Sequence, residues 1–300
     1  MMRSKGEKRF GVFNNILMAL FSIFFIFPVL FVIKTSLDMS TPTIDLAILP
    51  RHFTTMFYQM IVMDSSVYRP FLNSVLITVV GALGAMVFNC LGAYAMSKRS
   101  LPGMINMIYF MIVIPMFISG GTVAGYLLIK ALGWFNTYRV LIIPSMLSAM
   151  NMVIIRNYFW SLPKSLLEAA KIDGAGEFTV FTRIMLPLSK SVISATTLFT
   201  AVGYWNQYMP SILYNFSKPQ MRTFPVKIRE IFFINFGPTR LNELNNQLQA
   251  LGISNVGAGD LNPDALGAAM TIVSFLPILI LYPFLQKYFA AGMLKGSIKG

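Results

Sequence analysis

Eight polar or aromatic side chains stand within apolar stretches, where they are candidates for contact with a ligand. An amide in hydrocarbon costs free energy unless it is paired, so each must face another helix or a wet cavity. The three isolated asparagines are typical of helix-to-helix contacts, which is the alternative interpretation for them. In the remaining cluster, rings able to stack on a sugar flank two amides able to bind hydroxyls, and an interfacial aromatic belt is the alternative interpretation. The candidate substrate path consists of Asn73, Asn89, Asn151, Tyr204, Trp205, Asn206, Gln207 and Tyr208.

A second set of candidate residues lies in a polar interruption over residues 163–187. Pro163 favours the first turn of a helix, and the leucines and alanines after it continue that helix well. Gly174 is a natural stop, because glycine accepts the left-handed conformation that closes a helix. A second short helix is predicted from about Phe178 to Met185, ending before Pro187. The segment therefore predicts two small helices joined at a glycine.

Seven positions of this segment resemble the EAA loop of bacterial ABC importer permeases, and their fixed spacing makes the motif specific. In that family the loop is a coupling helix that sits in a cleft of a cytoplasmic ATPase subunit. The alternative is an amphipathic helix that rests on the membrane surface. The motif positions are Glu168, Ala169, Ala170, Gly174, Ile184, Leu186 and Pro187, and the resemblance implies an ATPase-coupling role for them and for Asp173.

Further motifs are similar to the carbohydrate-uptake branch of these permeases, over nearly the whole chain. The resemblance is nearest to permeases for larger or acidic oligosaccharides, such as alginate or pectin fragments. It implies that the C-terminal tail, with Lys295, Gly296, Lys299 and Gly300, contacts the ATPase dimer. Residues 214–265 depart from the maltose-importer type. The matching motifs are 70–74, 93–96, Trp205-Asn206 and 286–300.

Composition identifies an integral membrane protein. Of the 300 residues, 56% are hydrophobic and only 12% are charged, about half the usual charged fraction of a soluble domain. One cysteine, Cys90, and one histidine, His52, provide no metal site. No Walker A sequence occurs, so the resemblance assigns ATP and Mg²⁺ to partner subunits. The net charge of +13 predicts contact with anionic lipid headgroups rather than with nucleic acid, because the basic residues are scattered between apolar runs.

We expect an all-α protein with six transmembrane helices in one domain over residues 1–300, the type I ABC importer permease fold. The first apolar run is too long for a signal peptide and is read as an uncleaved span. Basic residues in the short connections predict cytoplasmic N- and C-termini, with long outer segments at 34–70 and 214–265. The predicted spans are 16–33, 71–96, 105–128, 140–160, 192–213 and 266–285.

The resemblance implies a non-catalytic permease subunit of a binding-protein-dependent oligosaccharide importer in the bacterial inner membrane. A second permease subunit, two ATPase subunits and an extracytoplasmic solute-binding protein are the expected partners. Alternatives are an ion-coupled secondary sugar transporter and a membrane scaffold, but the span interiors lack the ionisable groups that ion coupling generally needs. Five basic residues near the fifth span favour an acidic sugar, with docking of the binding protein as the alternative. They are Lys218, Arg222, Lys227, Arg229 and Arg240.

Overall fold

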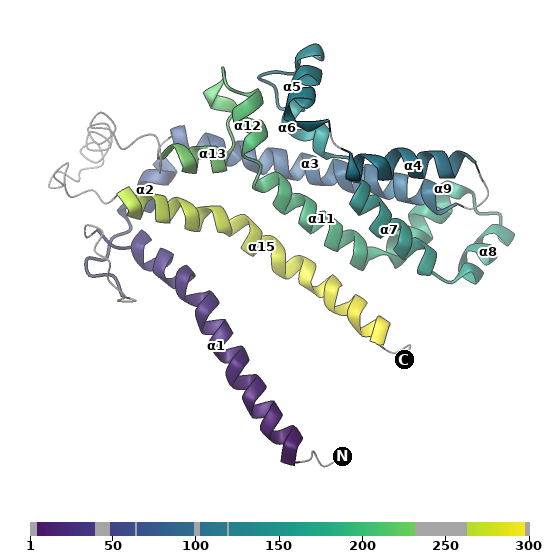
Figure 1. Ribbon diagram of the computed structural model, residues 1–300, viewed down its shortest axis with the longest axis horizontal. Coiled ribbons are helices and arrows are strands. Elements are labelled where there is room, and N and C mark those ends of the chain that lie inside the picture. The colour runs from purple at the N-terminus through teal and green to yellow at the C-terminus, as the bar shows by residue number, and fades with distance from the viewer. Residues whose placement is uncertain are drawn as a thin grey trace. The chain divides into compact units, whose positions relative to one another are not determined.

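The computed structural model describes residues 5–39, 49–63, 65–98, 103–118, 120–231 and 263–297. Within these ranges every regular element is a helix, and the only extended pairing is an isolated bridge between Asp38 and Phe53 (Figure 1). The prediction of an all-α protein is confirmed. Residues 232–262 of the predicted outer segment, together with Lys299 and Gly300 of the predicted tail, lie outside the described residues.

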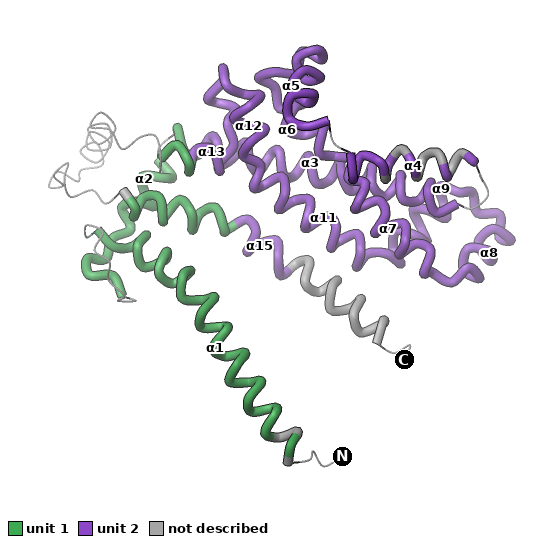
Figure 2. The backbone as a smooth tube through the Cα atoms, viewed as in Figure 1, with its two compact units in different colours: residues 1–68, 228–276 green, residues 69–227, 277–300 purple. Residues whose placement is uncertain are grey.

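The chain divides into two compact units, which Figure 2 distinguishes by colour. The first comprises residues 1–68 and 228–276, and the second comprises residues 69–227 and 277–300. The prediction of one permease domain was made for the whole chain, and it takes in both units.

The first unit contains α1 (Lys5–Ser36), which is charged in its first turns and apolar over most of its remaining length. Its candidate span, Arg9–Ser36, has no buried residues within its most apolar window, so its side chains are available to lipid or a partner. After α1, the Asp38 carboxylate accepts hydrogen bonds from the backbone N–H groups of Arg51 (3.1 Å) and His52 (3.2 Å). The short helix α2 (Met56–Met63) was not predicted. It buries four residues at helical spacing, Met56, Phe57, Met60 and Ile61.

The second unit contains most of α3 (Ser65–Ser97), together with α7 (Ala149–Ser161) and α11 (Lys190–Trp205). Two buried clusters hold it together. The first includes Ile77, Ala85, Ile129, Val140, Leu141, Ile142 and Tyr204. The second includes Cys90, Ala93, Ile155, Phe159, Val180, Phe181 and Met185.

Three described helices are long and apolar enough to cross a membrane, or five if each of two bent pairs counts as one span. The three are Arg9–Ser36, Ser66–Ser97 and Asp264–Pro283, and the last belongs to α15 (Pro263–Ser297). The predicted span over 105–128 is interrupted, because α4 (Met104–Phe117) ends before α5 (Gly121–Ala131) begins. The break precedes Gly121, the first residue of α5, which has a φ of 73°.

Two other predicted spans each consist of more than one helical element. The span over 140–160 consists of α6 (Arg139–Ile142), the 3₁₀ turn η1 (Ile143–Ser145) and α7, with a bend of 40°. The span over 192–213 breaks after α11, and α12 (Met209–Tyr214) follows with a proline in its first turn. Proline lacks an N–H donor and suits a helix start, which explains breaks at Pro144 and Pro210. Two short elements complete the segment, η3 (Pro219–Met221) and α13 (Phe224–Arg229).

Candidate functional site

The polar interruption folds into α8 (Lys164–Ile172), a tight turn and α9 (Glu177–Val180). Pro163 occupies the N-cap position of α8, and Asp173 occupies its C-cap position. Gly174 has a φ of 77°, and the backbone N–H of Ala175 donates to the carbonyl oxygen of Ala170 at 2.9 Å. A positive φ is where glycine is favoured, so the helix stop predicted at Gly174 is confirmed.

The second half of the segment differs from the prediction at Pro187. The helix does not stop before this proline. Instead, α9 passes into the π-helical turn η2 (Phe181–Met185) and then into α10 (Leu186–Leu188), with Pro187 in the first turn of α10. A widened π turn changes the hydrogen-bonding register, so that the residue without an N–H falls at a new helix start.

The eight predicted coupling residues divide into an outer and an inner group. Ala170 and Leu186 pack against the second buried cluster and so anchor the loop, and Ile184 is half-buried. The remaining five are exposed: Glu168, Ala169, Asp173, Gly174 and Pro187. The motif therefore contains both the anchor of the loop and its accessible surface.

Two apolar residues that the motif does not include dominate the exposed side of this loop. Ile172 is 86% exposed and Phe178 is 74% exposed, on either side of the Gly174 turn. Large apolar side chains at such exposure indicate a contact surface when they gather at one place. A signal for them was present in the sequence, since both are bulky residues within six positions of one another in an otherwise polar turn.

A charged network joins the loop to the end of α3. The Glu177 carboxylate pairs with the ammonium groups of Lys98 and, at 3.0 Å, Lys171, and it accepts a hydrogen bond from the Tyr94 hydroxyl at 2.5 Å. Glu177 lies in the loop, outside the predicted spans. Donation by Lys98, Tyr94 and Lys171 lowers the pKa of this carboxyl to about 2, so it is ionised at neutral pH. The network could not be recognised from the sequence, because Tyr94 and Lys98 lie 83 and 79 residues from Glu177.

Two asparagines of the predicted path are hydrogen-bonded to residues that cap or connect other helices. The Asn73 amide donates to the carbonyl oxygens of Gln220 (2.8 Å) and Arg222 (3.0 Å), and its oxygen accepts from the Tyr138 hydroxyl at 2.8 Å. The Asn89 amide donates to the carbonyl oxygens of Ala85 and Met146, and its oxygen accepts from the backbone N–H of Ser148. These bonds favour the alternative stated for both residues.

The aromatic part of the cluster is also packed within the chain. Tyr204 is 3% exposed, and its hydroxyl donates to the carbonyl oxygen of Ile142 at 2.7 Å. Trp205 is equally buried and meets the Phe71 ring edge to face, with centroids 5.6 Å apart. Half-buried Asn151 donates through its amide to the Thr200 hydroxyl at 3.0 Å.

The other three members lie at the break between α11 and α12. Asn206 is exposed and Tyr208 is half-buried. Gln207 is 9% exposed, and its side-chain oxygen has no hydrogen-bond partner among the residues that the structure describes. These three consecutive residues therefore differ in exposure, and only Asn206 is exposed.

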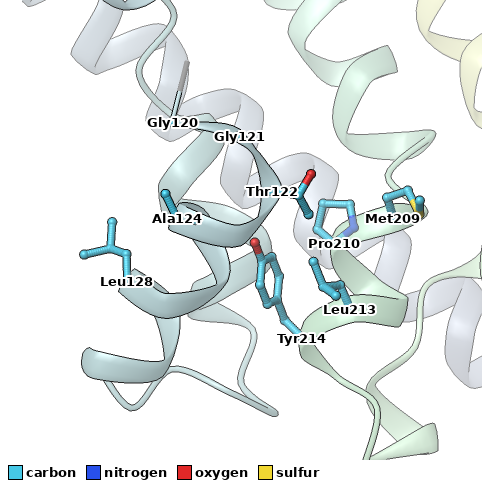
Figure 3. A pocket seen from close by; sticks show the side chains of 10 residues that line it. Gly120, Gly121, Thr122, Ala124, Leu128, Met209, Pro210, Leu213 and Tyr214 are labelled. Carbon is cyan, nitrogen blue, oxygen red and sulfur yellow. The ribbon is translucent and has the colours of Figure 1, made fainter. Parts of the chain in front are cut away.

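A separate pocket of 670 Å³ lies between α5 and α12 in the second unit (Figure 3). Its α5 wall is built from small residues, and the Tyr214 hydroxyl lies 3.6 Å from the position that a Cβ at Gly125 would take. Polar side chains are few in its lining, with Thr122 and Tyr214 contributing hydroxyl groups. None of the eight predicted path residues is among the lining residues, so this pocket is distinct from the predicted path.

The broken spans, the long apolar run of α1 and the exposed α8–α9 loop are features of a multi-span membrane protein. The chain belongs to the family of binding-protein-dependent transport system inner membrane components, whose pattern matches residues 91–295. It is thus a non-catalytic permease subunit of an ABC importer in the inner membrane. The family predicted from the EAA-like segment is confirmed.

Two relatives match over nearly their whole length. The polygalacturonan/rhamnogalacturonan transport system permease protein YtcP of Bacillus subtilis (strain 168) is 34% identical, over 94% of this chain and 95% of the relative. Protein LplC of the same organism is 35% identical, over 100% of this chain and 98% of the relative.

A solved structure shows the same fold. It is a chain of a bacterial ABC transporter involved in the import of the acidic polysaccharide alginate, with a TM-score of 0.83. The match covers 96% of this chain and 99% of that chain, at 24% identity. The prediction of the type I permease fold is confirmed by this likeness and by the family.

Proposed function

We propose that this chain is one of two permease subunits of an ATP-driven importer of acidic oligosaccharides. A second permease subunit completes the membrane part, and two ATPase subunits bind ATP and Mg²⁺ on the cytoplasmic side. An extracytoplasmic binding protein delivers the sugar. The observation that carries the proposal is the α8–α9 loop, which exposes Ile172 and Phe178 while Ala170 and Leu186 pack against the second buried cluster, in a chain of this family.

The acidic class of substrate is supported by charge and by the relatives. Residues 214–231 contain Lys218, Arg222, Lys227 and Arg229 against one acid, Glu230. A surface of one sign raises the local concentration of a ligand of the opposite sign. A relative that transports polygalacturonan and a structural neighbour that imports alginate both handle uronic-acid polymers.

The loop and both termini lie on the cytoplasmic side in this proposal, and residues 214–231 lie outside. The end of α15, which includes Lys295 and Gly296, then reaches the ATPase pair together with Lys299 and Gly300. Support for this orientation comes from the basic residues in the short connections.

The mechanism is alternating access without covalent chemistry in this chain. Closure of the ATPase pair moves the coupling loop and shifts the helices from an inward-open to an outward-open state. The binding protein then releases its sugar, and ATP hydrolysis resets the cycle. ATP and sugar must each favour one of these two states for coupling to occur.

Within the predicted path, Asn206 and Tyr208 are the strongest candidates for sugar contact. They lie at a break in a spanning segment, where irregular backbone at membrane depth is tolerated beside a cavity or protein. The other six residues of the predicted path do not contact the sugar in this proposal. They are Asn73, Asn89, Asn151, Tyr204, Trp205 and Gln207. They hold the surrounding helices in position.

The docking surface is tested by co-purification of the ATPase subunit with the permease pair. Ile172→Ser combined with Phe178→Ser removes exposed apolar area, so less ATPase should remain bound while the permease still inserts. Phe216→Ser is the matched control, since Phe216 is 56% exposed in the segment proposed to lie outside. Full ATPase retention by the double variant, or equal loss in the control, would contradict docking at this loop.

A further inference from the structure

One carboxylate receives donors from two separate elements at the base of the coupling loop. Tyr94 and Lys98 come from the end of α3 and the residue that follows it, whereas Lys171 comes from the last turn of α8. The acceptor, Glu177, stands in the first turn of α9, where a negative charge is favoured by the helix dipole. We call these four residues the Glu177 clamp.

The α3 side of the clamp is held in place by packing. The Tyr94 ring lies 4.9 Å from the Phe181 ring and 6.4 Å from the Phe159 ring, between centroids, beside the second buried cluster. The Lys98 ammonium lies over the face of the Tyr94 ring, 4.3 Å from the ring centroid. The face of an aromatic ring attracts a cation. Tyr94 and Lys98 are therefore held in position by contacts other than those with Glu177.

The clamp is exposed enough that its ion pairs contribute little to folding stability. The side chains of Glu177 and Lys171 are 55% and 56% exposed, and that of Lys98 is 23% exposed. Ion pairs of this kind are screened by solvent and salt. Three donors on one half-exposed carboxylate fix the orientation of that carboxylate more than they stabilise the fold, because each donor approaches it from a different residue.

We propose that the Glu177 clamp makes the coupling loop and the adjoining end of α3 move as one body. The inference rests on the proposed function, since it assumes that the loop is displaced by the ATPase subunits. With the clamp closed, a displacement of α8 and α9 is passed to α3 through Tyr94 and Lys98. With the clamp open, the loop stays joined to α3 only by the apolar packing of the second buried cluster, and ATP is hydrolysed with a smaller matching movement of α3. Glu177 and Lys98 are positioning residues in this account.

The test is a double-mutant cycle on the complete importer in proteoliposomes. Lys98→Gln, Glu177→Gln and the double variant are compared for uptake of an oligogalacturonate per ATP hydrolysed. Tyr94→Phe removes the hydroxyl and keeps the ring packing. Lys190→Gln is the matched control, because it removes the same charge from an exposed residue at the start of α11.

Each single change at Lys98 or Glu177 should lower uptake per ATP by about fivefold or more, with ATPase activity retained. The double variant should lose no more than the single variants, because all three lack the same contact. Tyr94→Phe should show a smaller loss, and Lys190→Gln should match the wild type.

Unchanged uptake per ATP in the single variants would overturn the clamp, and so would multiplicative losses in the double variant. A parallel fall in uptake, ATPase activity and recovered complex would also overturn it, because a purely structural role gives that result. Failure of the wild-type complex to use ATP for uptake would instead overturn the proposed function. A coupled wild type with unaffected clamp variants would overturn this inference alone.

Discussion

Tyr204 fits against α3 because residue 81 is a glycine. A Cβ at Gly81 would lie 2.6 Å from ring carbons of Tyr204, closer than real Cβ atoms approach. The ring cannot swing away freely, since its hydroxyl is bonded to the carbonyl oxygen of Ile142 and the residue is 3% exposed. The position of the Tyr204 ring is therefore set by its packing against Gly81 of α3.

Gly81→Ala should destabilise the protein by about 1–3 kcal/mol, because an added methyl group in a packed site forces neighbours apart. Thermal unfolding in detergent measures this. Gly203→Ala on the facing helix segment is the control, since no atom lies within 4 Å of its Cβ position. An equal effect at both positions would show that the Tyr204 contact is not responsible.

Asn89 joins α3 to the segment before α7 through its hydrogen bonds with Met146 and Ser148. It is 2% exposed, and Asn89→Leu would leave the Met146 carbonyl and the Ser148 N–H without their partner. We expect a loss of about 1–3 kcal/mol in the free energy of unfolding, the usual cost of a buried group left unpaired. Asn206→Leu, at an exposed position, should leave the unfolding temperature unchanged. Equal stability of the two variants would argue against the packing role of Asn89.

Polar residues in apolar runs could be recognised from the sequence, but their partners could not. In the sequence, Asn73 and Asn89 cannot be distinguished from Asn206. Only the fold shows that the first two amides are hydrogen-bonded within the chain and that Asn206 is exposed. The Glu177 clamp was missed for a related reason. Its members lie up to 83 residues apart, and no periodicity connects them.

The coupling loop is the element that sequence reasoning described best. Its helix, its glycine turn and its small residues all follow from local chemistry, because propensity and a positive φ act over a few residues. The predicted end of the second helix was wrong, because the π turn at 181–185 depends on the packing of Phe181 and Met185 in the second cluster. The breaks in the spans over 140–160 and 192–213 were missed although Pro144 and Pro210 mark them.

Gly174→Val should weaken coupling while leaving membrane insertion intact. A Cβ at Gly174 would have no atom within 4 Å, so we assign the effect to the backbone, where a left-handed conformation costs an ordinary residue about 1–2 kcal/mol. Gly176→Val is the matched control, because its φ is −68° and its surroundings are equally open. Uptake per ATP should fall in the first variant only. A similar fall in both would point to bulk at the surface rather than to the turn.

At the scale of the whole molecule, orientation in the membrane remains a prediction with a direct test. Ser217 and Ser165 are both exposed, and Cys90 is 3% exposed. In a Cys90→Ser background, Ser217→Cys should react with an impermeant thiol reagent added outside cells, and Ser165→Cys should react only after the membrane is opened. The reverse pattern would overturn the proposed topology and place the coupling loop on the wrong side for an ATPase.

The central claim is that this subunit couples ATP hydrolysis to sugar import through the α8–α9 loop. The most direct measurement is uptake of an oligogalacturonate by proteoliposomes that contain the complete importer and its binding protein, with no ion gradient. We predict uptake that requires enclosed ATP, and its loss in the Ile172→Ser, Phe178→Ser variant. Uptake that needs an ion gradient but no ATP, or ATP-driven uptake unchanged in that variant, would contradict the account.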